Sequence, residues 1–211
     1  MQGDRDLAAT QLLMSHLCHE LVSPIGAVNN GIEMLEDFEG DAMAPEAVAL
    51  IAESGKAAAA KLRFYRLAYG RAGQAGDLGL PQCAAAAGEL LAADGRVRLD
   101  WDAAATARLI AGGPQLVLNL VVLAVTALPR GGRVAVSSGE RGPVRFAASG
   151  VGAKLSEVVN AVVQGRETPL DHGNIHAWYC HRLAVRLGTA VKVAAAPDEV
   201  GFEVDIERLI D

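Results

Sequence analysis

Near its start the chain carries one uninterrupted helical pattern, and this pattern limits the possible folds more than any other feature. From residue 7 to about residue 37, apolar side chains recur at helical spacing, and no glycine occurs there before Gly26. The apolar series consists of Leu13, Leu17, Leu21, Ile25, Val28, Ile32 and Leu35. We therefore predict one long helix whose apolar side packs against another element.

A short turn and a second long helix follow. Residues 38–44 are predicted to form the turn, and Pro45 starts the next helix because proline fits the first helical position without losing a hydrogen bond. That helix is expected to end near Tyr69, since Gly70 is typical of the position just past a helix end. Its apolar side carries Val48, Ile51, Ala58, Leu62 and Tyr65. Two long helices joined by so short a loop lie antiparallel.

Such a hairpin buries little apolar surface by itself. Pairing with a second copy of the chain is the simplest way to complete a four-helix core. The sequence therefore predicts a homodimer held together by a four-helix bundle.

A second, mixed domain is predicted after a glycine-rich linker at residues 71–80. We expect residues 1–72 to form the hairpin and residues 77–211 the second domain. Its helices are expected at 82–92, 114–128, 154–163 and 175–187, and its strands at 97–101, 107–110, 133–138, 144–148, 190–195 and 201–206. Strands and helices do not alternate strictly, which favours an α+β sandwich with helices covering one face of a mixed sheet.

Composition argues against several classes of partner. The 25 acidic and 19 basic residues include no dense basic run, so no nucleic acid is expected as a partner. No segment approaches about 20 uninterrupted apolar residues, and the polar start does not resemble a signal peptide, so we expect a cytoplasmic protein without membrane contact. The widely spaced Cys18, Cys83 and Cys180 favour neither a disulfide framework nor a paired-cysteine metal site.

His19 is the first candidate functional residue, because it lies on the side of the predicted helix opposite the apolar series. At about 100° per residue, most of that series falls roughly 160° to 240° away from His19. The surface around His19 is mostly small and polar, which allows another protein to approach the imidazole. The predicted partner-binding residues on this surface are Ser15, His16, Val22, Ser23, Gly26 and Asn30.

The neighbours of His19 suit a nucleophile. A neutral imidazole has one nitrogen free to attack phosphorus, and Glu20 is predicted to orient the ring or accept its proton. Pro24 removes an amide that would bond to the carbonyl of Glu20, so the helix should bend just after the histidine. A lone histidine on a polar helix face is more often only a solvated side chain, so the surrounding motif has to decide between the two interpretations.

Residues 17–25, with the sequence LCHELVSPI, closely resemble the H-box of two-component histidine kinases. In that motif His-Glu-Leu is followed by two residues and proline, on the first helix of a dimerising hairpin. The resemblance implies that His19 accepts a phosphoryl group. His16 lacks the following Glu-Leu-x-x-Pro and is interpreted as a helix-surface residue.

The second domain resembles the ATP-binding domain of the same kinases only in outline. Residues 115–124 resemble the N-box, but Leu123 stands where an asparagine holds magnesium, and leucine offers no oxygen ligand. Residues 144–152 resemble the Asp-x-Gly-x-Gly box, but Ala148 replaces the aspartate that reads adenine. Bulky residues at 175–179 replace the glycine-rich lid. The resemblance implies a degenerate, Bergerat-type ATPase-like fold that does not bind ATP.

Nearly the whole chain resembles the alphaproteobacterial histidine phosphotransferases of the ChpT type. The resemblance implies that His19 takes a phosphoryl group from the receiver domain of a hybrid histidine kinase. It would then pass the group to response-regulator receivers, including cell-cycle regulators. Those receivers would supply the phosphorylated aspartate and the magnesium, so no metal or other cofactor is expected on this chain.

Three alternatives stay open. A non-catalytic scaffold or inhibitor of a histidine kinase would bind receivers without phosphoryl transfer. An ATP-using histidine kinase would have to bind nucleotide despite Leu123 and Ala148. The histidines and Cys180 within residues 172–181 offer donors for zinc, but Cys180 is predicted to face the core.

Overall fold

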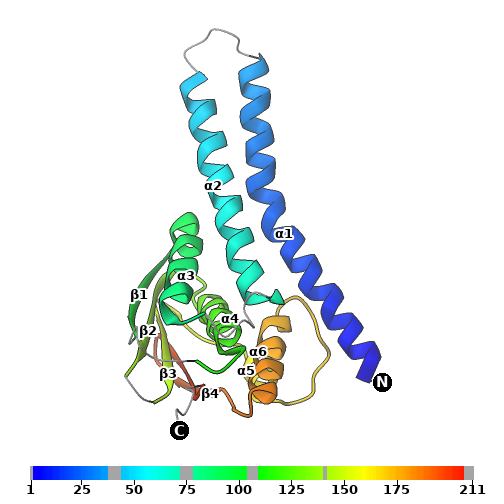
Figure 1. Cartoon of the computed structure of the whole chain (residues 1–211), viewed down its shortest axis with the longest axis vertical. Coiled ribbons are helices and arrows are strands. Elements are labelled where there is room, and N and C mark those ends of the chain that lie inside the picture. Colours follow the sequence, from blue (N-terminus) through cyan, green and yellow to red (C-terminus); the bar gives the residue numbers. More distant parts are fainter. Residues whose placement is uncertain (1, 38–43, 72–77, 104–108, 140–141, 207–211) are drawn as a thin grey trace.

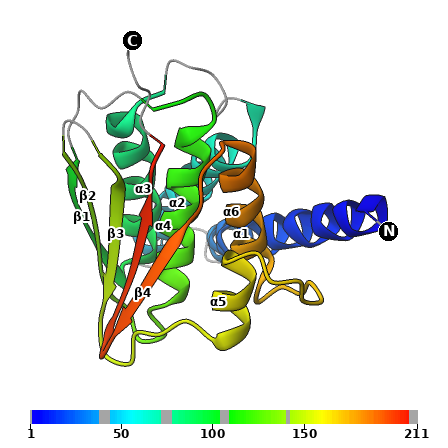
Figure 2. The same ribbon diagram turned by 90° about the horizontal axis from the view of Figure 1, so that it is seen from below.

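The computed structural model describes residues 2–37, 44–71, 78–103, 109–139 and 142–206. A helical hairpin stands on a second domain, in which helices cover one face of a five-stranded sheet (Figures 1 and 2). The fold is therefore α+β, as the sequence predicts. The predicted domain boundary, between residues 72 and 77, lies outside the described residues.

The hairpin consists of α1 (Gln2–Asp37) and α2 (Ala44–Ala68), which lie side by side in Figure 1. The two helices approach closely at Gly31. A Cβ atom at this position would lie 2.6 Å from Cγ1 of Ile51 and 3.2 Å from the carbonyl oxygen of Ala47. The missing side chain of Gly31 therefore permits this close approach.

The apolar side predicted for α2 is only partly right. Tyr65 is buried, but Val48 and Leu62 are 55% and 52% exposed. The buried residues of α2 are Ala47, Ala60, Phe64, Tyr65 and Ala68. On α1, Ile25 and Ile32 are also exposed in the single chain. These exposed apolar side chains form the surface available to the second copy that the sequence predicts.

The sheet has the strand order β1-β2-β3-β5-β4. Its strands are β1 (Val97–Ala103), β2 (Gly132–Ser138), β3 (Val144–Ser149), β4 (Lys192–Ala196) and β5 (Glu199–Val204). β1 and β2 are parallel, and the other neighbours are antiparallel. Alternate residues of β3 are buried, as expected for a sheet with one covered face. Residues 107–108 of the strand expected at 107–110 lie outside the described residues, and residues 109–110 belong to none of these strands.

The helices of the second domain are α3 (Leu80–Asp94), α4 (Gly113–Thr126), α5 (Glu157–Val163) and α6 (Ile175–Arg186). α5 begins later than expected, because the Ser156 side chain accepts a hydrogen bond from the amide of Val159 at 3.2 Å and caps the helix there. α4 is apolar on nearly all sides and lies centrally between the sheet and the other helices (Figure 2). None of the described helices is long and apolar enough to cross a membrane.

Two buried amide side chains of α4 hold the end of α2. Nδ2 of Asn119 donates to the carbonyl of Ala68 at 2.9 Å, and Nε2 of Gln115 donates to the carbonyl of Gly70 at 2.8 Å. The last carbonyls of a helix have no partner within the helix, so these bonds satisfy groups that would otherwise be unpaired. Arg186 of α6 donates to Oε1 of Gln115 at 2.8 Å, which joins a third helix to the same junction.

We predict opposite stability effects for two glycine-to-alanine changes. Gly31→Ala should lower the free energy of unfolding by about 1–3 kcal/mol, because its methyl group overlaps Ile51. Gly88→Ala is the control on α3, where a Cβ meets nothing within 4 Å, and it should raise stability by about 0.5–1 kcal/mol. Urea unfolding of both variants measures the difference, and stabilisation by Gly31→Ala would contradict the close packing.

Candidate functional site

His19 is exposed on α1, as the helical pattern predicts. Its ring faces the ring of His172, which belongs to the loop between α5 and α6, with a centroid separation of 6.2 Å and an interplanar angle of 79°. The structure therefore brings a second imidazole to the predicted phosphate acceptor.

Lys61 of α2 compensates for the proline beside His19. Pro24 has no amide hydrogen, so the carbonyl oxygen of Glu20 loses its partner within the helix. Nζ of Lys61 donates to this carbonyl oxygen at 2.9 Å and to Oε2 of Glu20 at 2.8 Å. α1 continues through Pro24 and changes direction along its length (Figure 1), and the position of the predicted bend just after His19 stays a prediction. Lys61 therefore anchors the helix next to His19.

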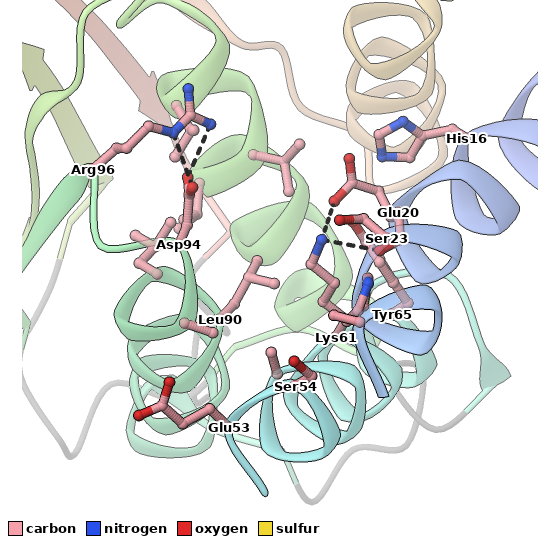
Figure 3. Close-up of a pocket in the computed structure, with 18 of the residues that line it drawn as sticks. His16, Glu20, Ser23, Glu53, Ser54, Lys61, Tyr65, Leu90, Asp94 and Arg96 are labelled. Carbon is pink, nitrogen blue, oxygen red and sulfur yellow. Dashed lines mark hydrogen bonds and ion pairs between the residues drawn. The ribbon is translucent and has the colours of Figure 1, made fainter. Parts of the chain in front are cut away.

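The Glu20 carboxylate points toward α2 and Lys61 (Figure 3). Partial burial alone would raise the pKa of this carboxyl, but the hydrogen bond and positive charge of Lys61 outweigh it and bring the pKa below its usual value. The Tyr65 hydroxyl is a further hydrogen-bond partner, and burial together with Glu20 raises the pKa of Tyr65. Glu20 is thus held ionised next to His19. Its predicted action on the His19 ring stays a prediction.

An open cavity of about 610 Å³ lies beside this ion pair. Its walls come from α1, α2, α4 and the end of α3, so it separates the hairpin from the second domain. In Figure 3, Glu20, Ser23 and Lys61 line one side, and Asp94 with Arg96 lines the other. Asp94 and Arg96 form their own ion pair at 2.9 Å. The cavity therefore opens next to the acceptor helix and is lined by charges of both signs.

His16 is not the solvated surface residue that the sequence suggests. It is half-buried, with its ring 4.4 Å from the ring of His176 and 6.0 Å from that of Tyr65. Nδ1 of His176 lies 3.0 Å from the Tyr69 hydroxyl. Burial lowers the pKa of His176 to about 4 and also lowers the pKa of His16, so both rings are neutral near pH 7. This packing could not be predicted from the sequence, because the residues that contact His16 lie on α2 and α6.

The other predicted partner-binding residues differ in exposure. Val22 is 66% exposed, and Ser23 and Asn30 are also exposed. Ser15 and Gly26 are half-buried, and a Cβ at Gly26 would meet nothing within 4 Å. Whether these positions bind a partner stays a prediction.

The positions that resemble a nucleotide site are used for packing. Leu123 is 1% exposed and Ala148 is fully buried. Asn119 is the remaining N-box asparagine. Its Nδ2 donates hydrogen bonds to the carbonyls of Ala68 and Gln115. Among the described residues, no group of three or more His, Cys, Asp or Glu side chains is placed to hold a metal ion. Cys180 is buried in the core, as predicted.

Sequence reasoning did not identify Lys61 and His172 as neighbours of the motif. Lys61 follows an alanine run on the second helix, and a lysine there is usually solvated. The missing donor at Pro24 was a usable signal, since a freed carbonyl needs a new partner. Nothing in the local pattern around His172 indicates its proximity to His19.

We predict that the role of Lys61 depends on Pro24. Lys61→Met should lower the free energy of unfolding by about 1–2 kcal/mol, because it leaves the Glu20 carbonyl and carboxylate without this donor. In a Pro24→Ala background the loss should be about 1 kcal/mol smaller, because the new amide of residue 24 can bond to the Glu20 carbonyl. Urea unfolding of the four proteins forms a double-mutant cycle. Equal losses in both backgrounds would contradict this account.

Comparison with known proteins identifies the family. A family model described as the histidine phosphotransferase C-terminal domain matches residues 81–199. The chain is 32% identical over 210 residues to the protein phosphotransferase ChpT of Brucella abortus (strain 2308), covering 95% of each chain. A solved structure of a bacterial phosphotransferase matches with a TM-score of 0.80 at 28% identity, covering 94% of this chain and 96% of that chain. The chain therefore belongs to the ChpT-type histidine phosphotransferases of phosphorelays.

Proposed function

We propose that His19 is the residue that carries the phosphoryl group in this phosphotransferase. It would accept the group from a receiver-domain aspartate of a hybrid histidine kinase and pass it to response-regulator receivers. The observation that supports this role is the exposed His19 imidazole, next to the Glu20 carbonyl to which Lys61 donates. We expect the protein to meet these partners in the cytoplasm.

The transfer needs only a nucleophilic nitrogen and a correctly presented aspartyl phosphate. A ring nitrogen of His19 attacks phosphorus and forms an N–P bond, while the P–O bond to the aspartate breaks and the carboxylate leaves. The receiver supplies the aspartate and its magnesium. Glu20 is the proposed helper that orients the ring or accepts its proton, and its carboxylate is paired with Lys61.

A donor other than ATP fits the second domain. Leu123 and Ala148 stand where the related kinases use magnesium-binding and adenine-binding side chains, and both are buried among apolar neighbours. Asn119 and Gln115 are engaged by the end of α2. These residues stabilise the junction of the two domains, and the phosphoryl group is expected to come from another protein.

The proposed assembly is a homodimer with the receivers docking near His19. Exposed apolar side chains on both hairpin helices, including Val48 and Leu62, provide surface for a second copy. Val22, Ser23, Gly26 and Asn30 are the proposed first contacts of a receiver, beside the cavity that Ser23 helps to line.

We predict that His19→Ala abolishes acceptance of label from a phosphorylated receiver domain, because the substitution removes the proposed acceptor nitrogen. His181→Ala, which removes a histidine on α6, is the matched control and should accept label as the wild type does. Gel autoradiography of the mixed proteins measures the outcome. Persistent labelling of His19→Ala would refute the assignment.

The same assay separates the alternatives. A scaffold or kinase inhibitor would bind the receiver before and after His19→Ala and would take no label in either form. An ATP-using kinase would release or absorb heat when titrated with ATP and magnesium, whereas a phosphotransferase without a nucleotide site should give no heat of binding.

We predict that Gly26→Arg blocks transfer while the protein still dimerises. A Cβ at Gly26 has free space, so the arginine can fold outward and occupy the surface that a receiver needs. Gly26→Ala is the control, since a methyl group should leave transfer near the wild-type rate. Label transfer and size-exclusion chromatography are the two measurements. Normal transfer by Gly26→Arg would mean that receivers dock elsewhere.

A further inference from the structure

Four of the five histidines of the chain lie in two pairs at one corner of the molecule. His16 pairs with His176, and His19 pairs with His172. The first pair has a centroid separation of 4.4 Å and the second a separation of 6.2 Å, and both are edge-to-face. The fifth, His181, lies elsewhere on α6 beside Gly165.

The two pairs have different environments. In the His16–His176 pair the Nε2 atoms are buried and have no hydrogen-bond partner in the described part of the chain, and burial keeps the rings neutral. His19 and His172 are both exposed. The wider, exposed pair is therefore the one that a group from solvent or from a partner can enter.

The loop that carries His172 is held by its own hydrogen bonds. Oδ1 of Asp171 accepts from the amides of Gly173 at 2.9 Å and Asn174 at 3.0 Å, and Oδ1 of Asn174 accepts from the amide of Asp171 at 3.1 Å. Nδ2 of Asn174 donates to the carbonyl of Pro169 at 2.9 Å. Asn174 is 1% exposed. These bonds fix the backbone on both sides of His172.

A second set of bonds ties the same loop to α1. Arg5 donates to Oε1 of Glu167 at 3.1 Å and to the carbonyl of Thr168 at 3.2 Å. Figure 1 shows this loop reaching out from α6 to lie beside α1. Two sets of hydrogen bonds therefore hold His172 opposite His19: one within the loop and one between the loop and α1.

We propose that His172 donates a hydrogen bond to an oxygen of the phosphoryl group on His19. The proposal rests on the proposed function of His19. His172 forms no covalent bond: its ring N–H, neutral or protonated, binds a phosphoryl oxygen while the N–P bond forms or breaks at His19. Hydrogen bonds to ionised acceptors are stronger than neutral ones, and a phosphoryl group presents three such oxygens.

Such a bond exists only when His19 is phosphorylated, so it shifts the transfer equilibrium. It should draw the phosphoryl group from the receiver aspartate toward His19. At a given ratio of phosphorylated to free receiver, removing this bond should lower the equilibrium ratio of phosphorylated to free His19 by about fivefold. This change corresponds to about 1 kcal/mol, as expected for a hydrogen bond to a charged group at an exposed site.

The test uses the full chain and a phosphorylated receiver domain that labels the wild type. His172→Ala should lower the equilibrium ratio of phosphorylated to free His19 by about fivefold at the same ratio of phosphorylated to free receiver. His172→Gln keeps an N–H donor and should restore at least half of the loss, whereas His181→Ala should equal the wild type. The ³¹P NMR shift of phosphorylated His19 should move in His172→Ala and stay in place in His181→Ala, which separates contact with phosphorus from loss of packing.

Each outcome decides between distinct possibilities. Wild-type labelling and an unchanged ³¹P shift in His172→Ala overturn the role of His172, while the loss of label in His19→Ala still supports the proposed function. Higher labelling of His172→Ala would mean that the loop shields His19, which also overturns the proposal. Label that survives in His19→Ala but is lost in His172→Ala would make His172 the acceptor and would overturn both.

Discussion

The hydrogen bonds between α4 and the end of α2 are the interaction on which the rest of the structure depends. Asn119 and Gln115 are buried polar side chains inside an apolar helix, where unpaired polar groups are costly. They pair with the terminal carbonyls of Ala68 and Gly70, which need partners for the same reason. These bonds join the hairpin to the second domain. The cavity beside Glu20 and the approach of the α6 loop to α1 both follow from that placement.

Much of the hairpin and of the acceptor face was predictable from sequence alone. Helical spacing indicated α1 and its exposed His19, and Gly70 marked the end of α2, because these features are set by local backbone chemistry. Pro24 also indicated that the Glu20 carbonyl lacks its partner within the helix. Periodicity does not show which distant residue will contact a given local group. Lys61 and His172 therefore appeared only in the folded chain.

Asn119 is a residue whose tertiary role could not be predicted from its local sequence. It lies in the segment that resembles a degenerate nucleotide motif, and in the folded chain its amide binds the end of α2 at the domain junction. The exposed Val48 and Leu62 are a second case, since helical spacing assigns them to an apolar side without saying whether the same chain or a second copy covers it. Local patterns define what a side chain can do, and tertiary contacts decide what it does.

The junction between the hairpin and the second domain also affects which side of α1 a partner can reach. The second domain is fastened to the end of α2 by hydrogen bonds from Gln115 and Asn119 of α4. The side of α1 that carries His16 and Glu20 is turned toward α6 and α2. The proposed acceptor therefore offers one free face, and a donor receiver and an acceptor receiver would have to occupy that face in turn.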